Sequence, residues 1–311
     1  MRVVVFGFQT WGHRTLRAIL DSRHEVVLVV THSAGNSPYE RMWSDSVEDL
    51  ARDAKIPVRV AKRPDADLIA AIDGLDPDII VANNWRTLLP REIYARPRLG
   101  TLNIHDSLLP AYAGFSPLVW ALINGESHVG VTAHLMDEGL DTGPIITQQS
   151  VPVGPRDRTV DLFHRTIDVI EPLVTGALDL LERGEAVAVP QDAAQATYFH
   201  KRSEQDSRID WSWPPEAIER LIRAQSDPYP NAFSSFRGQR IRVLRASLSA
   251  GRYGGTPGRV SIEDHGGVAV VAGPDAWRGR NRAVVLHELR LDDGREVDAR
   301  KLIGDSGAYL E

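Results

Sequence analysis

Two polar side chains, Asn103 and His105, lie two positions apart at the end of an apolar stretch that has the character of a strand. Because side chains alternate between the two faces of a strand, both point to the same face. Burying two polar side chains together costs free energy, so the pair indicates a purpose. A third polar residue, Asp141, lies in a turn after a later strand-like stretch, and it can reach His105 if the two strands are neighbours.

An amide, an imidazole and a carboxylate together suit the attack of an amine on an acyl or formyl group. The amide and the imidazole can hold the oxygen on which negative charge develops. The attacking nitrogen must lose a proton, which needs a base that works near neutral pH, and a carboxylate can hold the imidazole in one tautomer. The chain has no cysteine and no evident serine nucleophile, and this chemistry needs no covalent enzyme intermediate.

The elements that must position these side chains form an alternating series over the first 150 residues. Strands are predicted at residues 2–6, 24–31, 58–60, 78–82, 100–104 and 129–136, with helical patterns between them. Strand–helix–strand alternation with short connections predicts an open, mostly parallel sheet. Such sheets bind ligands at the carboxyl ends of their strands. One long amphipathic helix is predicted over residues 161–183, with a kink at Pro172.

A different organisation begins near residue 205. One helix at residues 214–225 precedes several short strands separated by turn signals, a pattern typical of a small antiparallel barrel. The predicted fold class is therefore α/β, with an open, mostly parallel Rossmann-like sheet domain over residues 1–203. A small OB-like β-barrel domain follows over residues 204–311.

Charge and hydropathy narrow the range of partners. The 311 residues carry a net charge of −6, which divides into −8 for residues 1–200 and +2 for residues 201–311. A domain that grips nucleic acid usually has a clear basic excess, so nucleic acid is not the expected partner. No apolar run reaches the length of a membrane span or a signal-peptide core. We expect a cytoplasmic enzyme with no membrane partner, and the sequence leaves its oligomeric state open.

Two long stretches resemble a known family. NIHDSLLPAYAG and GVTAHLMDEGLDTGPI, in this order, are similar to the motifs of the 10-formyltetrahydrofolate-dependent formyltransferases. The resemblance covers nearly the whole chain, because RIDWSWPPEAIERLIRA and PYPNAF look like the C-terminal barrel domain of that family. It implies formyl transfer to a nitrogen atom, with Asn103, His105 and Asp141 as the catalytic residues.

The resemblance also implies how the co-substrate 10-formyltetrahydrofolate is held. It assigns the folate to the loop after the fourth strand and to the loop before the catalytic aspartate. The residues concerned are Arg86, Thr87, Leu88 and Leu89 in the first loop and Asp137, Glu138 and Gly139 in the second. No metal is expected, because the catalytic trio lacks the ligand spacing of zinc or calcium sites.

The acceptor differs between branches of the family, which include methionyl-tRNA, sugar-nucleotide and siderophore-pathway hydroxyornithine formyltransferases. The tRNA enzymes carry a basic insertion after the second strand, whereas the stretch HSAGNSPYERMWSDSVEDLARDAKIPV is short and acidic. The segment AYAGFSPLVWALINGE looks most like the siderophore-pathway enzymes. We therefore expect a small amine or hydroxylamine acceptor, hydroxyornithine. Methionyl-tRNA is one alternative, and a sugar nucleotide whose phosphate pairs with Arg86 is another.

Loops at the strand ends supply seven further candidates for contacts with the acceptor: Gln9, Thr10, Trp11, Trp85, Asp106, Ser107 and Tyr112. Turn capping is an equal alternative for Asp106, as is a loop hydrogen bond for Ser107. Aromatic residues beside strands, such as Trp85, belong more often to the core than to a pocket. His134, on a buried strand, is expected to be a hydrogen-bonded core histidine.

Two functions of other kinds remain open. The chain can be a folate-binding module without transfer activity, or it can hydrolyse formyltetrahydrofolate with water as the acceptor. The intact trio argues against the first of these. A nicotinamide cofactor is disfavoured, because the stretch GFQTWG after the first strand lacks the glycine spacing of a dinucleotide-binding turn.

Overall fold

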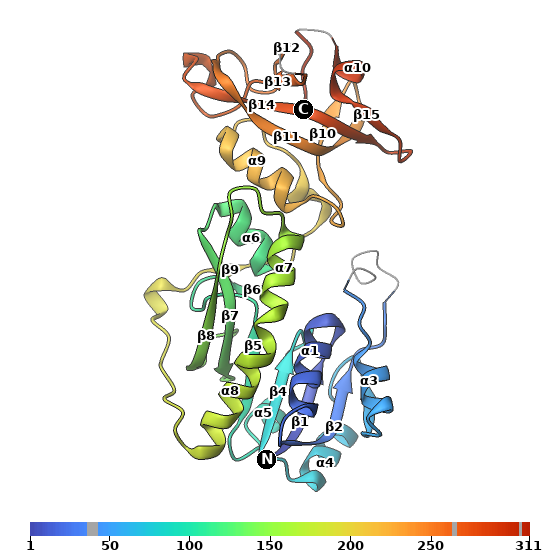
Figure 1. Cartoon of the computed structure of the whole chain (residues 1–311), viewed down its shortest axis with the longest axis vertical. Helices are drawn as coiled ribbons and strands as arrows, with labels where there is room; N and C mark the ends of the chain where they lie inside the picture. The colour runs from blue at the N-terminus through green and yellow to red at the C-terminus, as the bar shows by residue number, and fades with distance from the viewer. Residues whose placement is uncertain (36–42, 263–265, 305–306) are drawn as a thin grey trace. The chain divides into compact units, whose positions relative to one another are not determined.

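The computed structural model describes residues 1–35, 43–262, 266–304 and 307–311. These residues form two compact units that interleave along the chain (Figure 1). The N-terminal unit comprises Met1–Pro117, His128–Pro152 and Phe163–His200, and the C-terminal unit comprises Leu118–Ser127, Val153–Leu162 and Lys201–Glu311. The boundary expected between residues 203 and 204 stays a prediction.

The N-terminal unit is built on a seven-stranded sheet with the order β3-β2-β1-β4-β5-β7-β8. The first five strands in this order pair in parallel, and β7 and β8 are antiparallel to their neighbours. The strands are β1 (Arg2–Gly7), β2 (Glu25–Thr31), β3 (Val58–Val60), β4 (Ile79–Asn83), β5 (Thr101–His105), β7 (His128–Leu135) and β8 (Ile145–Pro152). The predicted open, mostly parallel sheet is confirmed.

The central strands could be predicted from the sequence because each is a run of hydrophobic residues. β1, β2 and β4 consist almost wholly of buried apolar residues, as expected for parallel strands covered on both faces. β8 was not predicted. It is an edge strand with the sequence IITQQSVP, most of which is not buried, so it lacks the apolar run that marks its neighbours.

The helices before residue 184 are α1 (Gln9–Leu20), α3 (Val47–Asp53), α4 (Ala66–Leu75), α5 (Arg91–Tyr94), α6 (Pro117–Asn124), α7 (Thr159–Asp168) and α8 (Ile170–Arg183). Most of α6 and the start of α7 belong to the C-terminal unit. A short parallel pair, β6 (Ala113–Gly114) and β9 (Tyr198–Phe199), lies outside the large sheet. The prediction of one kinked helix over residues 161–183 was wrong, because the structure has two helices divided at Val169. Pro172 has no N–H to donate to the carbonyl of Asp168, which is the last residue of α7.

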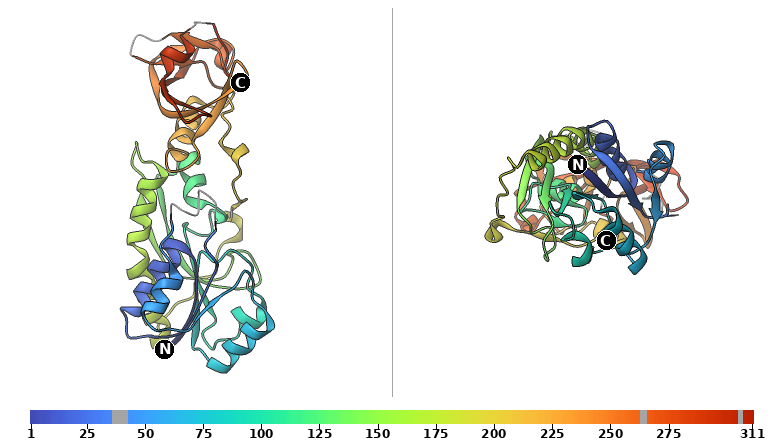
Figure 2. Two further views of the ribbon diagram at one scale, coloured as in Figure 1. Left: turned by 90° about the vertical axis from the view of Figure 1, so that its right-hand side faces the viewer. Right: turned by 90° about the horizontal axis from the view of Figure 1, so that it is seen from below.

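The C-terminal unit contains an antiparallel barrel (Figure 2). Its strand order is β10-β11-β14-β13-β12, and β15 also pairs with β14. The elements are α9 (Pro215–Ala224), β10 (Ala232–Phe236), β11 (Gln239–Tyr253), β12 (Val260–Ile262), β13 (Val268–Val270), β14 (Asn281–Leu291), β15 (Glu296–Asp298) and α10 (Ala299–Ile303). The predicted small barrel is confirmed.

Residues 307–311 join the two edge strands of the barrel. Leu310 bridges to Phe236 of β10, and Tyr309 bridges to Arg259, which precedes β12. The backbone of Ser235 and that of Glu311 exchange two hydrogen bonds of 2.7 and 2.9 Å. Because both outer strands pair with this one segment, the sheet closes on itself.

No described helix has the length and apolar character needed to cross a lipid bilayer. The stretch after β2 was expected to be short and acidic. Part of it, residues 36–42, lies outside the described residues.

Candidate active site

Two adjacent strands bring the first polar residues of the site together. In the pairing of β5 with β7, Asn103 lies opposite His134 and His105 lies opposite Thr132. The loop after β7, residues 136–144, carries Asp141 back to β5. The strands that had to be neighbours for Asp141 to reach His105 are therefore neighbours.

The loop that carries Asp141 is tightly turned. Asp141 itself has a left-handed backbone, with φ of 57°, which non-glycine residues adopt at a cost in free energy. A Cβ atom on Gly143 would overlap the carbonyl oxygen of Leu135, and one on Gly139 would overlap Thr142. Glycine at position 143 therefore lets the loop approach β7, and glycine at position 139 lets the loop turn tightly on itself.

Asp137 organises the same loop. Its Oδ1 accepts hydrogen bonds from the backbone N–H of Gly139, at 3.0 Å, and from the hydroxyl of Thr142, at 2.7 Å. The side chain of Asp137 thus shapes the turn that presents Asp141. Glu138 and Gly139 are exposed, and the folate-binding role expected for these three residues stays a prediction.

Asn103 lies at the centre of the polar cluster. Its Nδ2 donates to Asp141 Oδ1 at 3.3 Å and lies 3.1 Å from Nε2 of His134. The His105 Nδ1 atom is 3.6 Å from Asp141 Oδ2, which is longer than a hydrogen bond. The structure brings together the three residues expected to be catalytic and adds His134 to them.

Hydrogen bonds to backbone carbonyls fix the donor nitrogen of each imidazole. His134 Nδ1 lies 3.0 Å from the carbonyl oxygen of Leu135, and because a carbonyl only accepts, this nitrogen carries the proton. In the tautomer with its proton on Nδ1, His134 accepts a hydrogen bond from the Asn103 amide at Nε2. In His105 the donor is Nε2, which lies 3.0 Å from the carbonyl oxygen of Tyr112. Asp141 faces the other nitrogen of His105.

The Asp141 carboxylate is held in its charged form. Burial alone would raise its pKa, but the two histidines and the backbone N–H of Gly114 outweigh burial and lower the pKa to about 2. The Gly114 N–H donates to Asp141 Oδ2 at 2.9 Å. At neutral pH this carboxylate is therefore ionised and can accept a proton or hold a cationic imidazole, but it cannot supply a proton.

Asp106 has the opposite electrostatic character. Burial raises the pKa of its carboxyl group to about 6, while His105 and Trp11 oppose the rise. The Trp11 Nε1–H is buried beside this carboxyl group. The site thus holds a second carboxylate, next to His105, that gains its charge near neutral pH.

The loops after β1 and β4 meet through Gln9. Its Oε1 accepts hydrogen bonds from Asn84 Nδ2, at 3.2 Å, and from the Arg86 guanidinium, at 2.9 Å. Arg86 also lies over the ring of Phe8, with its Cζ 4.6 Å from the ring centroid. Gln9 and Thr10 are both buried. Arg86 is therefore committed to contacts with its own unit, and the expected pairing with a phosphate would have to compete with them.

Two buried polar groups in the loop after β4 lack partners. Trp85 Nε1 and Thr87 Oγ1 make no hydrogen bond with any residue that the structure describes. Trp85 stacks on His32, with ring centroids 3.8 Å apart. Leu88 is 84% exposed, whereas Leu89 is buried. Unpaired buried groups are rare in proteins, and these two belong to the loop that is expected to hold the folate.

Ser107 and Tyr112 are engaged within the loop after β5. The hydroxyl of Ser107 donates to the carbonyl of Ala111 at 2.8 Å, which is the loop hydrogen bond considered as its alternative role. The backbone N–H of Tyr112 donates to the hydroxyl of Thr197 at 2.8 Å, and its ring stacks on Phe199. Contacts of Ser107 and Tyr112 with the acceptor stay predictions.

Two residues of the cluster were not expected from the sequence. His134 was assigned to the core, yet it contacts Asn103; its register opposite Asn103 was the signal that could have placed it in the site. The Gln191 side chain donates to the carbonyl oxygens of Asp141, at 2.8 Å, and Gly143, at 2.7 Å. Gln191 comes from an irregular segment, and no pattern in the sequence points to it.

Gln191→Ala should lower kcat by about tenfold and leave the KM for the acceptor nearly unchanged, because the loop that orients Asp141 loses both of its side-chain donors. Steady-state kinetics and thermal unfolding measure the two effects. Gln195→Ala is a matched control, because the side chain of Gln195, in the same segment, donates to Asp192 and to no described residue of the Asp141 loop. Equal losses of kcat in the two variants would contradict a positioning role for Gln191.

One group of potential metal ligands lies in the described residues of the N-terminal unit: His24, Asp179 and Glu182. Arg23 forms ion pairs with both carboxylates, at 2.8 Å and 2.6 Å. The negative charge that would attract a cation is thus already balanced by a guanidinium.

Family models match both parts of the chain. A model described as "Formyl transferase" matches residues 1–175, and one described as "Formyl transferase, C-terminal domain" matches residues 201–306. A methionyl-tRNA formyltransferase of Synechococcus sp. (strain JA-2-3B'a(2-13)) is 37% identical over 252 residues, which are 79% of this chain and 77% of that protein.

Solved structures share the fold at lower sequence identity. HypX from Aquifex aeolicus in complex with tetrahydrofolic acid is 20% identical with a TM-score of 0.60, and the match covers 98% of this chain but only 47% of that one. This chain thus spans about half the length of HypX. An N-formyltransferase from Helicobacter canadensis, in complex with folinic acid and dTDP-3-aminofucose, is 18% identical with a TM-score of 0.66, covering 91% of this chain and 98% of that one.

Proposed function

This chain belongs to the formyl transferase family, and we propose that it moves the formyl group of 10-formyltetrahydrofolate to the hydroxylamino nitrogen of a small amino acid, hydroxyornithine. The observation that carries this choice of acceptor is the Asp106 carboxylate beside His105. A carboxylate at this place can accept a hydrogen bond from the N–OH group or from an ammonium group. It repels a phosphate.

The donor folate is assigned to the loop after β4. Trp85 Nε1 and Thr87 Oγ1 are buried without a partner among the described residues, and a heterocycle with carbonyl and ring-nitrogen acceptors would satisfy them. The exposed Leu88 offers apolar surface beside them. Structural relatives with tetrahydrofolate or folinic acid bound share this fold, which supports a folate as the co-substrate.

The transfer joins the acceptor nitrogen to the formyl carbon and then breaks the bond from that carbon to N10 of the folate. Asn103 and His105 hold the formyl oxygen while it carries negative charge. The proton of the attacking nitrogen leaves towards the His105–Asp141 pair and ends on N10 of the departing tetrahydrofolate. A hydroxylamine is less basic than an alkylamine, so it arrives neutral and needs no prior loss of a proton.

Methionyl-tRNA is a second candidate acceptor. The 37% identical relative from Synechococcus is named for it, so a nucleic-acid acceptor stays open. The charge of −8 over residues 1–200 disfavours close approach of a polyanion. Sugar nucleotides are a third class, in line with the dTDP-3-aminofucose bound to the Helicobacter canadensis relative.

A panel of acceptors tests the proposal. The whole chain is incubated with 10-formyltetrahydrofolate and, separately, with hydroxyornithine, ornithine, an amino-sugar nucleotide and methionyl-tRNA, and the release of tetrahydrofolate is followed. Hydroxyornithine should react fastest, and ornithine, which differs only in lacking the N–OH oxygen, is the matched control. Faster formylation of methionyl-tRNA would overturn the choice of acceptor, and formate release without any amine would identify a hydrolase instead.

A further inference from the structure

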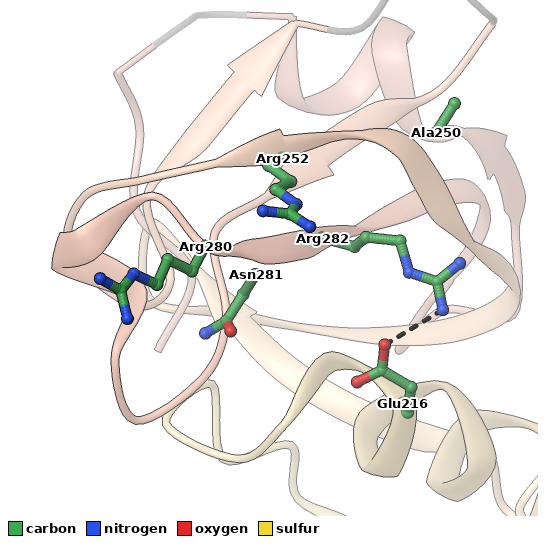
Figure 3. Close-up of a pocket in the computed structure, with 6 residues that line it drawn as sticks. All are labelled: Glu216, Ala250, Arg252, Arg280, Asn281 and Arg282. Carbon is green, nitrogen blue, oxygen red and sulfur yellow. Dashed lines mark hydrogen bonds and ion pairs between the residues drawn. The ribbon is translucent and has the colours of Figure 1, made fainter.

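The C-terminal unit contains a cavity of about 400 Å³ that the proposed transfer reaction does not use. It lies where the end of β11 and the start of β14 face the first turn of α9 (Figure 3). Six residues line it: Glu216, Ala250, Arg252, Arg280, Asn281 and Arg282. We call it the arginine cavity, because three guanidinium groups and a single carboxylate supply its charge.

Two arginines of this cavity lie where their positive charges repel each other. Arg252 and Arg282 are directly opposite each other in the pairing of β11 with β14, and like charges in that position destabilise a sheet. Only Arg282 has a counter-ion, since its guanidinium lies 3.0 Å from Glu216 (Figure 3). Arg252 and Arg280 form no ion pair or hydrogen bond with any residue in the described ranges. The cavity therefore carries a net charge of about +2.

Other arginines on the same strands are paired. Arg245 of β11 lies 2.7 Å from Glu288, and Arg290 of β14 lies 2.8 Å from both Asp227 and Glu296. The unpaired arginines are thus not a general property of these strands. An anion in the cavity would relieve the repulsion between Arg252 and Arg282.

We propose that the arginine cavity binds a phosphate-bearing ligand. Guanidinium groups match phosphate oxygens with two parallel hydrogen bonds. The guanidiniums of Arg252 and Arg280 point apart (Figure 3), so each can supply such a pair to a different anionic group. A volume of about 400 Å³ exceeds a single phosphate and falls in the range of small-molecule sites. The phosphate can belong to a small phosphorylated metabolite or to a nucleic-acid backbone, which present the same chemistry.

Glu216 competes with the ligand for Arg282. It lies in the first turn of α9, and its carboxylate is the one negative side chain among the residues that line the cavity. Removing its charge should therefore strengthen anion binding, whereas removing Arg252 and Arg280 should weaken it. The opposite directions separate a built site from general attraction to a basic surface.

Titration calorimetry of the whole chain with pyrophosphate at low salt tests the site. We expect Arg252→Gln combined with Arg280→Gln to weaken binding by about tenfold or more, and Glu216→Gln to strengthen it. Arg245→Gln is the matched control, because Arg245 is an arginine of the same strand that already faces a carboxylate. Thermal unfolding without ligand should show no loss of stability in the double variant, since both side chains are exposed and the change removes one of two arginines that face each other.

A short RNA duplex, titrated in parallel, distinguishes the source of the phosphate. Binding of pyrophosphate that is lost in the double variant supports a small-molecule ligand. Binding of the duplex alone, lost in the same variant, supports a nucleic-acid backbone as the occupant. Absence of binding by both probes, or equal loss of binding in the Arg245→Gln control, overturns the proposal. Neither result depends on the acceptor of formyl transfer.

Discussion

His105→Ala should lower kcat by about 100-fold or more, because the variant loses a group that stabilises the oxygen of the transition state and passes on a proton. Asp141→Asn should have a loss of similar size, since its carboxylate faces His105 Nδ1 at 3.6 Å and is ionised at neutral pH. Both variants should lose kcat and kcat/KM equally, as expected for contacts made only in the transition state.

The measurement is single-turnover and steady-state release of tetrahydrofolate, together with the free energy of unfolding of each variant. His128→Ala is the matched control, because His128 is an exposed residue at the start of β7, the same strand that carries His134. A near-native rate for His105→Ala would remove the imidazole from the mechanism and with it the proposed path for the proton.

Asp106→Asn should make the chain more stable at neutral pH and a poorer enzyme. Burial raises the folded pKa of Asp106 from 3.8 to about 6, so ionising this carboxyl costs the folded state about 3 kcal/mol above pH 6. The unfavourable contribution is absent below the unfolded pKa and grows as the pH rises from about 4 to about 6. Asparagine avoids it at every pH.

Urea unfolding at about pH 4 and at about pH 7 checks the sign. The variant should exceed the wild type in stability at the higher pH and match it at the lower one. The control Asp67→Asn changes an exposed residue of α4. It should have the same stability as the wild type at both pH values. The KM for hydroxyornithine should rise in Asp106→Asn. If the variant is stabilised but its KM for hydroxyornithine is unchanged, Asp106 does not contact the acceptor.

The residues that could be predicted from the sequence are those whose position follows from local pattern. Alternation along β5 placed Asn103 and His105 on one face, and the glycines around Asp141 marked a tight turn. The same alternation along β7 applied to His134. Its contact with Asn103 could not be predicted, because it depends on the register between β5 and β7.

What the sequence could not indicate depends on contacts between distant segments. Gln191 reaches the Asp141 loop from fifty residues away, and an irregular backbone carries no period from which to predict it. β8 was not predicted because an edge strand needs no apolar run. Pro172 was recognised as a disturbance, but whether a proline kinks or divides a helix is decided by the packing on either side.

The paired state of Asn103 has a consequence for how the enzyme begins each turnover. Both hydrogens of the Asn103 side-chain amide are directed at neighbours, to His134 and Asp141. Neither hydrogen is therefore available to the formyl oxygen before the substrate binds. The substrate must displace one of these contacts, and the longer one, at 3.3 Å to Asp141, is the weaker. Arrival of the folate would thereby loosen the aspartate at the moment when the acceptor nitrogen has a proton to give up.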